Sequence, residues 1–227
     1  MTTKKLCLSL DVVGCDECTS ILDATLPYID MVKVHIDTAE DPERLTTILS
    51  ALCSESNLQI IGDRKFADIG STVKKQYIRG KYKDWADYVT VHPLAGPGVF
   101  QGLIAANPDV KMLVVWSLTS CDNLITPVGE YQVRAIRLIN QFRGNVSGVI
   151  TRKGLVFEDM WHRWGKGPIP LVFSPGVKMH SDTDDLGQTY KAINNILADV
   201  FIVGRGIYLE KNRGEAAKKF KMIINHK

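Results

Sequence analysis

The sequence KMLVVWSL at residues 111–118 has the composition of a β-strand that is buried on both faces. Its apolar residues follow one another without alternating polar ones, as in a parallel strand that helices cover on each side. A segment with helical periodicity follows at residues 131–141. We interpret the two segments as one β–α unit.

The same succession of strand and helix extends in both directions from this unit. Other strand-like runs lie at residues 6–12, 31–36, 58–62, 87–91, 146–151, 170–173 and 200–203. The helix-like segments that follow them lie at residues 17–29, 43–54, 71–78, 99–106, 157–164, 186–197 and 214–224. About eight β–α units make a closed barrel. We expect an α/β fold, a single (β/α)8 TIM barrel over residues 1–227, and an open doubly wound sheet is the alternative.

The composition excludes several classes of protein. The chain has 227 residues, of which 45% are hydrophobic and 23% charged, as in ordinary globular proteins. A net charge of +3 is too small to predict a nucleic-acid or membrane surface, but it suits a small anionic ligand held by local cations. No apolar run approaches the length of a membrane span, and the N-terminal run is too short for a signal peptide. We expect a soluble, cytoplasmic protein.

The cysteines do not predict a disulfide framework or a metal site. There are five of them, an odd number, at Cys7, Cys15, Cys18, Cys53 and Cys121. Only Cys15 and Cys18 form a C-x-x-C pair, and no second pair lies nearby to complete a zinc site. We expect reduced thiols and no bound metal.

Polar residues follow the ends of the expected strands. They are Asp11, Lys33, Asp63, Lys65, His92, Thr119, Ser174 and Arg205. In a TIM barrel, the loops after the strands build the active site at one end of the barrel. These side chains are therefore the candidates for a shared site.

The charged sequence DRKFAD at residues 63–68 is the most informative of these segments. In an extended chain Asp63 and Lys65 point to the same side, and Asp68 lies where the next helix begins. The segment alone could be a salt bridge at a strand end with a helix cap. Lys33 occupies the corresponding strand end one unit earlier, and such an alternation of lysines and carboxylates keeps each group charged. A fixed array of this kind serves reactions in which negative charge moves.

The sequence IVGRG at residues 202–206 follows the last expected strand. In barrels, the loops after the last two strands often bind phosphate through backbone N–H groups at a helix N-terminus. Gly204 permits close approach of the backbone, and Arg205 adds a bidentate cation. The polar loop at residues 174–190 is long enough to close over a ligand. A tight turn beside a surface loop is the alternative interpretation.

Together, these motifs resemble the orotidine 5′-monophosphate decarboxylase family. The matching motifs are LSLD at 8–11, KVH at 33–35, DRKFADIGSTV at 63–73, HPLAGPG at 92–98, SLTS at 117–120, SPGV at 174–177, LGQTY at 186–190 and VGRG at 203–206. The pattern D-x-K-x-x-D-I-x-x-T is highly specific, and the motifs occur in the family's order over nearly the whole chain. The amino-acid sequences of these motifs mostly resemble those of the eukaryotic-type branch.

The resemblance implies decarboxylation of orotidine 5′-monophosphate to UMP without metal or cofactor, the last step of de novo pyrimidine nucleotide synthesis. It implies a catalytic array of Lys33, Asp63, Lys65 and Asp68. In this array Lys65 protonates C6 after CO2 leaves, and Asp63 faces the departing carboxylate.

The resemblance also implies how the substrate is bound. Asp11 and Lys33 hold ribose hydroxyls, and Thr119 lies against the pyrimidine edge. The residues implied at the phosphate are Gln188, Tyr190, Gly204 and Arg205. A homodimer is implied as well, in which Asp68 and Thr72 reach the neighbouring subunit's site.

Three other functions remain open from the sequence. A sister barrel could act on a phosphosugar through a metal-bound enediolate, as a decarboxylase or aldolase-like enzyme. A barrel that has lost its chemistry could bind nucleotide without turnover. A Schiff-base aldolase is disfavoured, because the neighbouring carboxylates keep Lys33 and Lys65 protonated and poorly nucleophilic.

Overall fold

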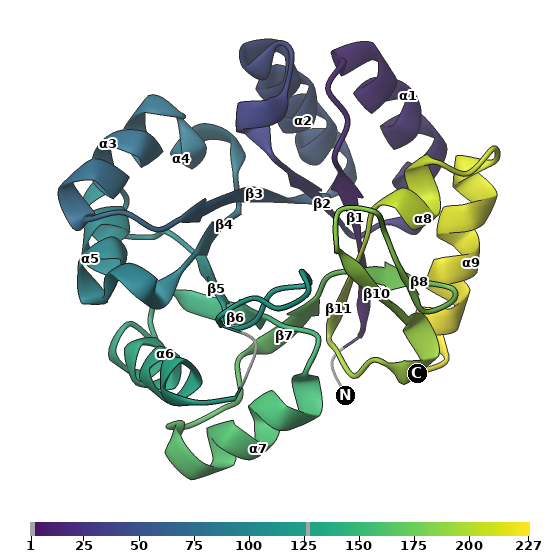
Figure 1. Cartoon of the computed structure of the whole chain (residues 1–227). Coiled ribbons are helices and arrows are strands. Elements are labelled where there is room, and N and C mark those ends of the chain that lie inside the picture. Colours follow the sequence, from purple (N-terminus) through teal and green to yellow (C-terminus); the bar gives the residue numbers. More distant parts are fainter. Residues whose placement is uncertain (1–2, 126–127) are drawn as a thin grey trace.

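The computed structural model describes residues 3–125 and 128–227 and shows a closed barrel of parallel strands inside a ring of helices (Figure 1). The strand order around the barrel is β1-β11-β7-β6-β5-β4-β3-β2. Strands β1 and β11 close it in parallel register, from Lys5 opposite Val200 to Leu8 opposite Val203. The expected TIM barrel is confirmed, and the alternative of an open sheet is wrong.

The barrel strands coincide with the apolar runs of the sequence. They are β1 (Lys5–Leu10), β2 (Met31–Val34), β3 (Gln59–Phe66), β4 (Tyr88–Val91), β5 (Met112–Val115), β6 (Val146–Ile150), β7 (Leu171–Ser174) and β11 (Val200–Val203). Their side chains are buried on both faces. One set, including Met31, Leu113 and Phe173, fills the barrel interior, and a larger set packs between the strands and the helices. This double burial explains why the runs do not alternate with polar residues.

Helices follow the strands around the outside. The longer ones are α1 (Cys15–Thr25), α2 (Pro42–Ser56), α3 (Gly70–Arg79), α5 (Pro97–Ala106), α6 (Glu130–Gln141), α7 (Gly154–Trp164) and α9 (Arg213–Asn225). Short helical turns are α4 (Tyr82–Trp85), α8 (Arg205–Tyr208), η1 (Leu26–Tyr28), η2 (Ile36–Thr38), η3 (Pro93–Ala95) and η4 (Ile193–Asn195). Side-chain hydrogen bonds cap the N-termini of two of these helices. Asp41 accepts a hydrogen bond from the Arg44 backbone at the start of α2, and Asn212 does the same for Glu215 in α9.

Helices α3 and α5 approach each other through glycine. A Cβ atom on Gly102 would collide with the carbonyl oxygen of Gly70 and lie 2.8 Å from its Cα atom. A Cβ atom on Gly98, one turn earlier in α5, would meet its nearest neighbour, the Gly70 nitrogen, at 3.6 Å. Hydrogen is therefore the only side chain that fits at Gly102 without moving a helix. This contact positions the start of α3 beside the barrel.

Two expected elements differ from the structure. Strand β3 continues to Phe66 instead of ending at Gly62, so Asp63 and Lys65 lie within it. The segment 186–197, expected to be helical, contains β10 (Thr189–Ala192) and η4 and no α-helix in the described chain. Strand β10 pairs with β8 (Val177–Lys178) and β9 (Asp182–Thr183) in a separate small sheet. Thr189 pairs with Thr183 and Tyr190 with Asp182, and these contacts between strands outweigh the apolar spacing that suggested a helix.

The barrel wall is also covered between β7 and β11, where the small sheet replaces the expected helix. Ile193 and Ile196 follow β10 and are buried in the main core, where the other units have a helix. Residues 180–183, which include β9, are exposed. Among the residues described, no helix is long and apolar enough to cross a membrane.

Candidate active site

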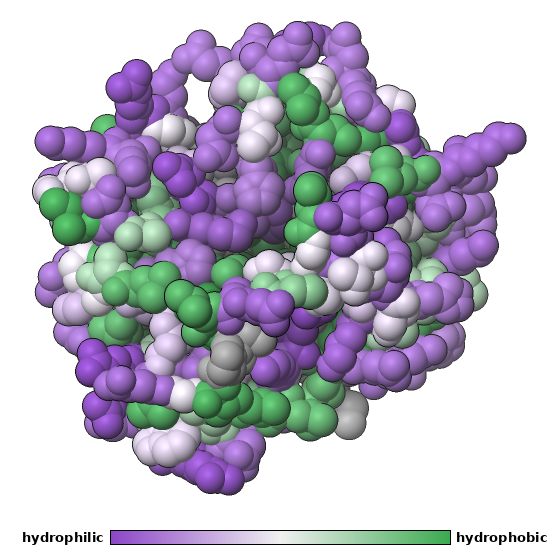
Figure 2. Space-filling view, in the orientation of Figure 1, coloured by the Kyte–Doolittle hydropathy of each residue, from purple (hydrophilic) through white to green (hydrophobic). Residues whose placement is uncertain are grey.

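A cavity of about 190 Å³ lies at the carboxyl ends of the barrel strands. Figure 2 shows mainly hydrophilic residues around a hollow near the middle of this face. The expected site residues that line the cavity are Asp11, Lys33, Asp63, Lys65, Thr119, Gln188, Tyr190, Gly204 and Arg205. They come from six different strands or the loops after them, so the closed barrel brings together residues that are far apart in sequence.

Asp63 is the centre of a charged array. Its side chain is 6% exposed, and its two oxygens lie 2.9 Å from the Lys33 Nζ atom and 3.0 Å from the Lys65 Nζ atom. Lys33 also lies 3.4 Å from an oxygen of Asp11. The carboxylates and ammonium groups therefore alternate in the order Asp11, Lys33, Asp63, Lys65.

The array keeps its buried members ionised. Burial alone would raise the pKa of Asp63, but Lys33 and Lys65 outweigh it and hold that pKa well below the usual value. Burial alone would lower the pKa of Lys33, but Asp63 and Asp11 hold it above the usual value. Both groups are charged at neutral pH, as the alternation in the sequence predicted.

His35 lies against Lys33. Its Nε2 atom is 3.0 Å from the Lys33 Nζ atom, and its pKa is lowered, first by burial and then by the Lys33 charge. A neutral His35 therefore accepts a hydrogen bond from Lys33 and fixes the direction of the ammonium group. Asp37 lies elsewhere, 3.7 Å from Arg64.

Thr90 on β4 was not singled out from the sequence, yet it supports the array. Its hydroxyl donates to Asp63 at 2.7 Å and accepts from the backbone N–H of Lys65 at 2.8 Å. Lys65 has φ 51°, in the left-handed region, at an irregularity in the pairing of β3 with β4. The contact with Asp63 thus depends on an unusual backbone conformation, held in part by Thr90. The available signal was one polar residue inside the apolar run at 87–91.

The expected phosphate residues meet around Arg205, at the start of α8. Its guanidinium lies 2.7 Å from an oxygen of Asp184 and donates to the Gln188 side chain at 2.8 Å. The Tyr190 hydroxyl donates to the same Asp184 oxygen at 3.2 Å. The pKa of Asp184 is lowered by the Gln188 backbone N–H and by Arg205. Asp184, which the sequence did not single out, thus places a carboxylate in the group of residues expected to hold phosphate.

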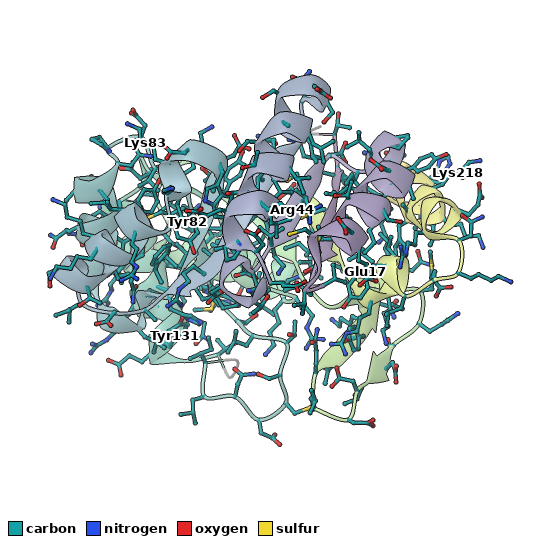
Figure 3. The ribbon with its side chains drawn as sticks, turned by 90° about the horizontal axis from the view of Figure 1, so that it is seen from above. Glu17, Arg44, Tyr82, Lys83, Tyr131 and Lys218 are labelled. Carbon is teal, nitrogen blue, oxygen red and sulfur yellow. The ribbon has the colours of Figure 1, made fainter. Side chains whose placement is uncertain are left out.

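Two loops at this end are joined to each other. The backbone N–H and hydroxyl of Thr189 both donate to the carbonyl oxygen of Thr119, at 3.0 and 2.8 Å. The Cys121 backbone N–H donates to the Gly187 carbonyl at 2.9 Å. Figure 3 shows that the β5–α6 loop and the small sheet project from the same end of the barrel. Thr119 and Gln188 are therefore held at one rim of the cavity.

Asp68 and Thr72 do not line the cavity of their own chain. Asp68 is exposed and accepts a hydrogen bond from the Ile69 backbone at 2.7 Å, just before α3. Thr72 lies half-buried in the first turn of that helix. The structure therefore separates these two residues from the other members of the expected site.

The fold and the charged cavity define the protein as a TIM barrel with a polar site at its strand ends. Within that class, the chain belongs to the Orotidine 5'-phosphate decarboxylase / HUMPS family, whose model matches residues 4–220. This membership confirms the resemblance that the motifs indicated.

Similar proteins agree with this assignment. The orotidine 5'-phosphate decarboxylase of Kodamaea ohmeri is 36% identical over 222 residues, which cover 92% of this chain and 82% of the relative. That of Cyberlindnera fabianii is 35% identical over 215 residues, 89% of this chain and 78% of the relative. The structure of orotidine 5'-monophosphate decarboxylase from Methanocaldococcus jannaschii, complexed with the inhibitor BMP, has the same fold. Its TM-score is 0.76 at 22% identity, over 98% of this chain and 99% of that one.

Proposed function

We propose that this protein decarboxylates orotidine 5′-monophosphate to UMP in pyrimidine nucleotide synthesis, without metal or organic cofactor. The observation that carries the proposal is the alternation of Asp11, Lys33, Asp63 and Lys65 around one cavity. Family membership supplies the substrate, and the array supplies a fixed acid for the chemistry.

The reaction breaks the bond between C6 and the carboxylate carbon. Its electron pair remains on C6, CO2 departs, and the Lys65 ammonium group then donates a proton to form the C6–H bond. Lys65 is left neutral and regains a proton from water. Because Lys65 is charged before the reaction, it also stabilises the negative charge that develops on C6.

Asp63 is the group that would face the departing carboxylate. It stays ionised between two lysines and is oriented by Thr90, so it cannot turn away from an incoming anion. The resulting repulsion acts on the substrate and is relieved when CO2 leaves.

The opposite end of the cavity would bind the phosphate. Arg205, Gln188 and Tyr190 supply donors there, and the phosphate would take the place of the Asp184 carboxylate at Arg205. Asp11 and Lys33 would hold ribose hydroxyls, Thr119 would contact the pyrimidine edge, and the Gly204 backbone would approach the phosphate. Binding energy from the phosphate would then be used to close the joined loops over the site.

We also propose a homodimer in which Asp68 and Thr72 complete the partner's site. Their position outside their own cavity supports this, since Asp68 is exposed at the entrance to α3. Cys7, Cys15 and Cys18 are free thiols, which fits a reducing, cytoplasmic location. We take residues 1–227 as one barrel domain.

The test measures loss of orotidine 5′-monophosphate absorbance with purified protein in EDTA. We expect turnover that persists in chelator, disappears in Lys65→Ala and is unchanged in Lys83→Ala, an exposed lysine on α4 that is labelled in Figure 3. Turnover that required a metal would favour a sister barrel using enediolate chemistry. Tight UMP binding without turnover would favour a binding-only barrel.

A further inference from the structure

Arg152 lies in the connection between β6 and α7 and does not line the cavity. We propose that Arg152 is a positioning residue for the substrate's phosphate, acting through Thr189 on its neighbours Gln188 and Tyr190. The inference rests on the proposed function, because it concerns how that substrate is held.

The contact between Arg152 and Thr189 is bidentate. One guanidinium nitrogen donates to the Thr189 carbonyl at 2.6 Å, and the other donates to the Thr189 hydroxyl at 2.5 Å. The two residues are 37 positions apart, so the bonds join the β6–α7 connection to the small sheet. A planar guanidinium presents two parallel N–H donors to such a pair of acceptors. The ammonium group of a lysine is a compact point charge and lacks this geometry.

Thr189 is the junction of three connections. It receives both bonds from Arg152, and its own N–H and hydroxyl donate to Thr119 in the β5–α6 loop. In the sequence it also lies between Gln188 and Tyr190, whose side chains both contact the Arg205 guanidinium. Fixing the backbone at Thr189 therefore fixes the direction in which its two neighbours project.

Arg152 differs from the other cations at this site in the charges of its neighbours. Lys33, Lys65 and Arg205 each lie beside a carboxylate, but no carboxylate in the described chain forms a salt bridge with Arg152. Arg152 is half-buried, and its guanidinium donates to Thr189. Withdrawing a cation from water without a counter-charge is unfavourable, so this arrangement is suited to a site that later receives an anion.

The test compares Arg152→Met with Arg163→Met, an exposed arginine on α7 that pairs with Asp159. We expect Arg152→Met to reduce kcat/KM for orotidine 5′-monophosphate roughly 10- to 100-fold, the loss of one to two charge-assisted hydrogen bonds. For orotidine, which lacks the phosphate, we expect a change below about threefold, because no phosphate is there for the loops to hold. Arg163→Met should leave both values unchanged.

Two further variants separate positioning from general damage. Thr189→Val removes one of the two bonds from Arg152 and also the hydroxyl bond to Thr119, so the loss in the double variant with Arg152→Met should be smaller than the sum of the two single losses. Arg152→Lys should recover only part of the loss, because it cannot reproduce the fork. Equal losses for orotidine and its phosphate, or no loss for either, would overturn the proposal.

Binding measurements keep this test independent of turnover. Titration calorimetry with UMP and uridine should show weaker UMP binding in Arg152→Met and unchanged uridine binding. If the unmodified protein did not turn over orotidine 5′-monophosphate, the proposed function would fail while this comparison still decided the role of Arg152. Equal weakening of both ligands would count against the proposal.

Discussion

Replacing Gly102 by alanine tests how α3 is held against the barrel. The new Cβ atom would lie 2.8 Å from the Gly70 Cα atom and closer still to its carbonyl oxygen, whereas ordinary contacts begin near 3.4 Å. The helices must therefore separate. Overpacking costs about 1–3 kcal/mol, and the gain in helix propensity offsets about 1 kcal/mol of it. We expect a net loss of up to about 2 kcal/mol, and Tm lower by up to about 8 °C.

Gly98→Ala is the matched control for this prediction. It adds the same methyl group to the same helix, but its nearest neighbour is at 3.6 Å, an ordinary contact. We expect an unchanged or slightly higher Tm by differential scanning calorimetry. Because α3 begins just after Asp68 and contains Thr72, Gly102→Ala should also reduce turnover in the proposed homodimer. Equal melting temperatures for the two variants would refute the close-contact argument.

Three further predictions concern charged groups of the site. Lys65→Gly and Lys65→Ala should both lack turnover. The glycine variant should be more stable towards urea by about 1 kcal/mol, because φ 51° is unfavourable for alanine. Equal urea midpoints for the two variants would argue against backbone strain at Lys65. The depressed pKa of Asp63 means that its contribution to stability is present above the unfolded pKa of about 4 and is lost as pH falls below it. Urea midpoints measured from pH 6 to pH 2 should therefore fall less steeply in Asp63→Asn than in the unmodified protein, and parallel curves would contradict this. Asp184→Asn keeps an oxygen for the turn but removes the charge beside Arg205, so UMP should bind roughly two- to fivefold more tightly, as expected for a partly exposed ion pair. Asp182→Asn, which alters the Lys178 pair instead, should leave UMP affinity unchanged, and equal effects of the two variants would exclude competition at Arg205.

The barrel and the central array could be predicted from the sequence because both depend on local patterns. Continuous apolar runs such as 111–118 predict strands buried on both faces, and charged residues at their ends predict a site at one end of the barrel. The ion pairs of Asp63 with Lys33 and Lys65 agree with that reasoning. The contribution of Asp68 and Thr72 to a partner's site stays a prediction.

The remaining features depend on contacts between distant residues. The helix expected at 186–197 was wrong because Thr189 bonds to Thr119, 70 positions earlier, and no local spacing encodes that pairing. The extension of β3 depends on the left-handed backbone of Lys65 and its bond to Thr90. Arg152 and Asp184 are likewise surface-type residues by sequence, and their partners appear only when the connections meet at the rim.

The small sheet between β7 and β11 has a consequence for the evolution of this scaffold. Ile193 and Ile196 cover the barrel wall at that place, while residues 180–183 of the small sheet are exposed. Insertions, deletions and exchanges in this exposed part therefore leave the wall intact. A descendant could acquire a different ligand by replacing this one segment, with the inherited barrel and its lysines unchanged.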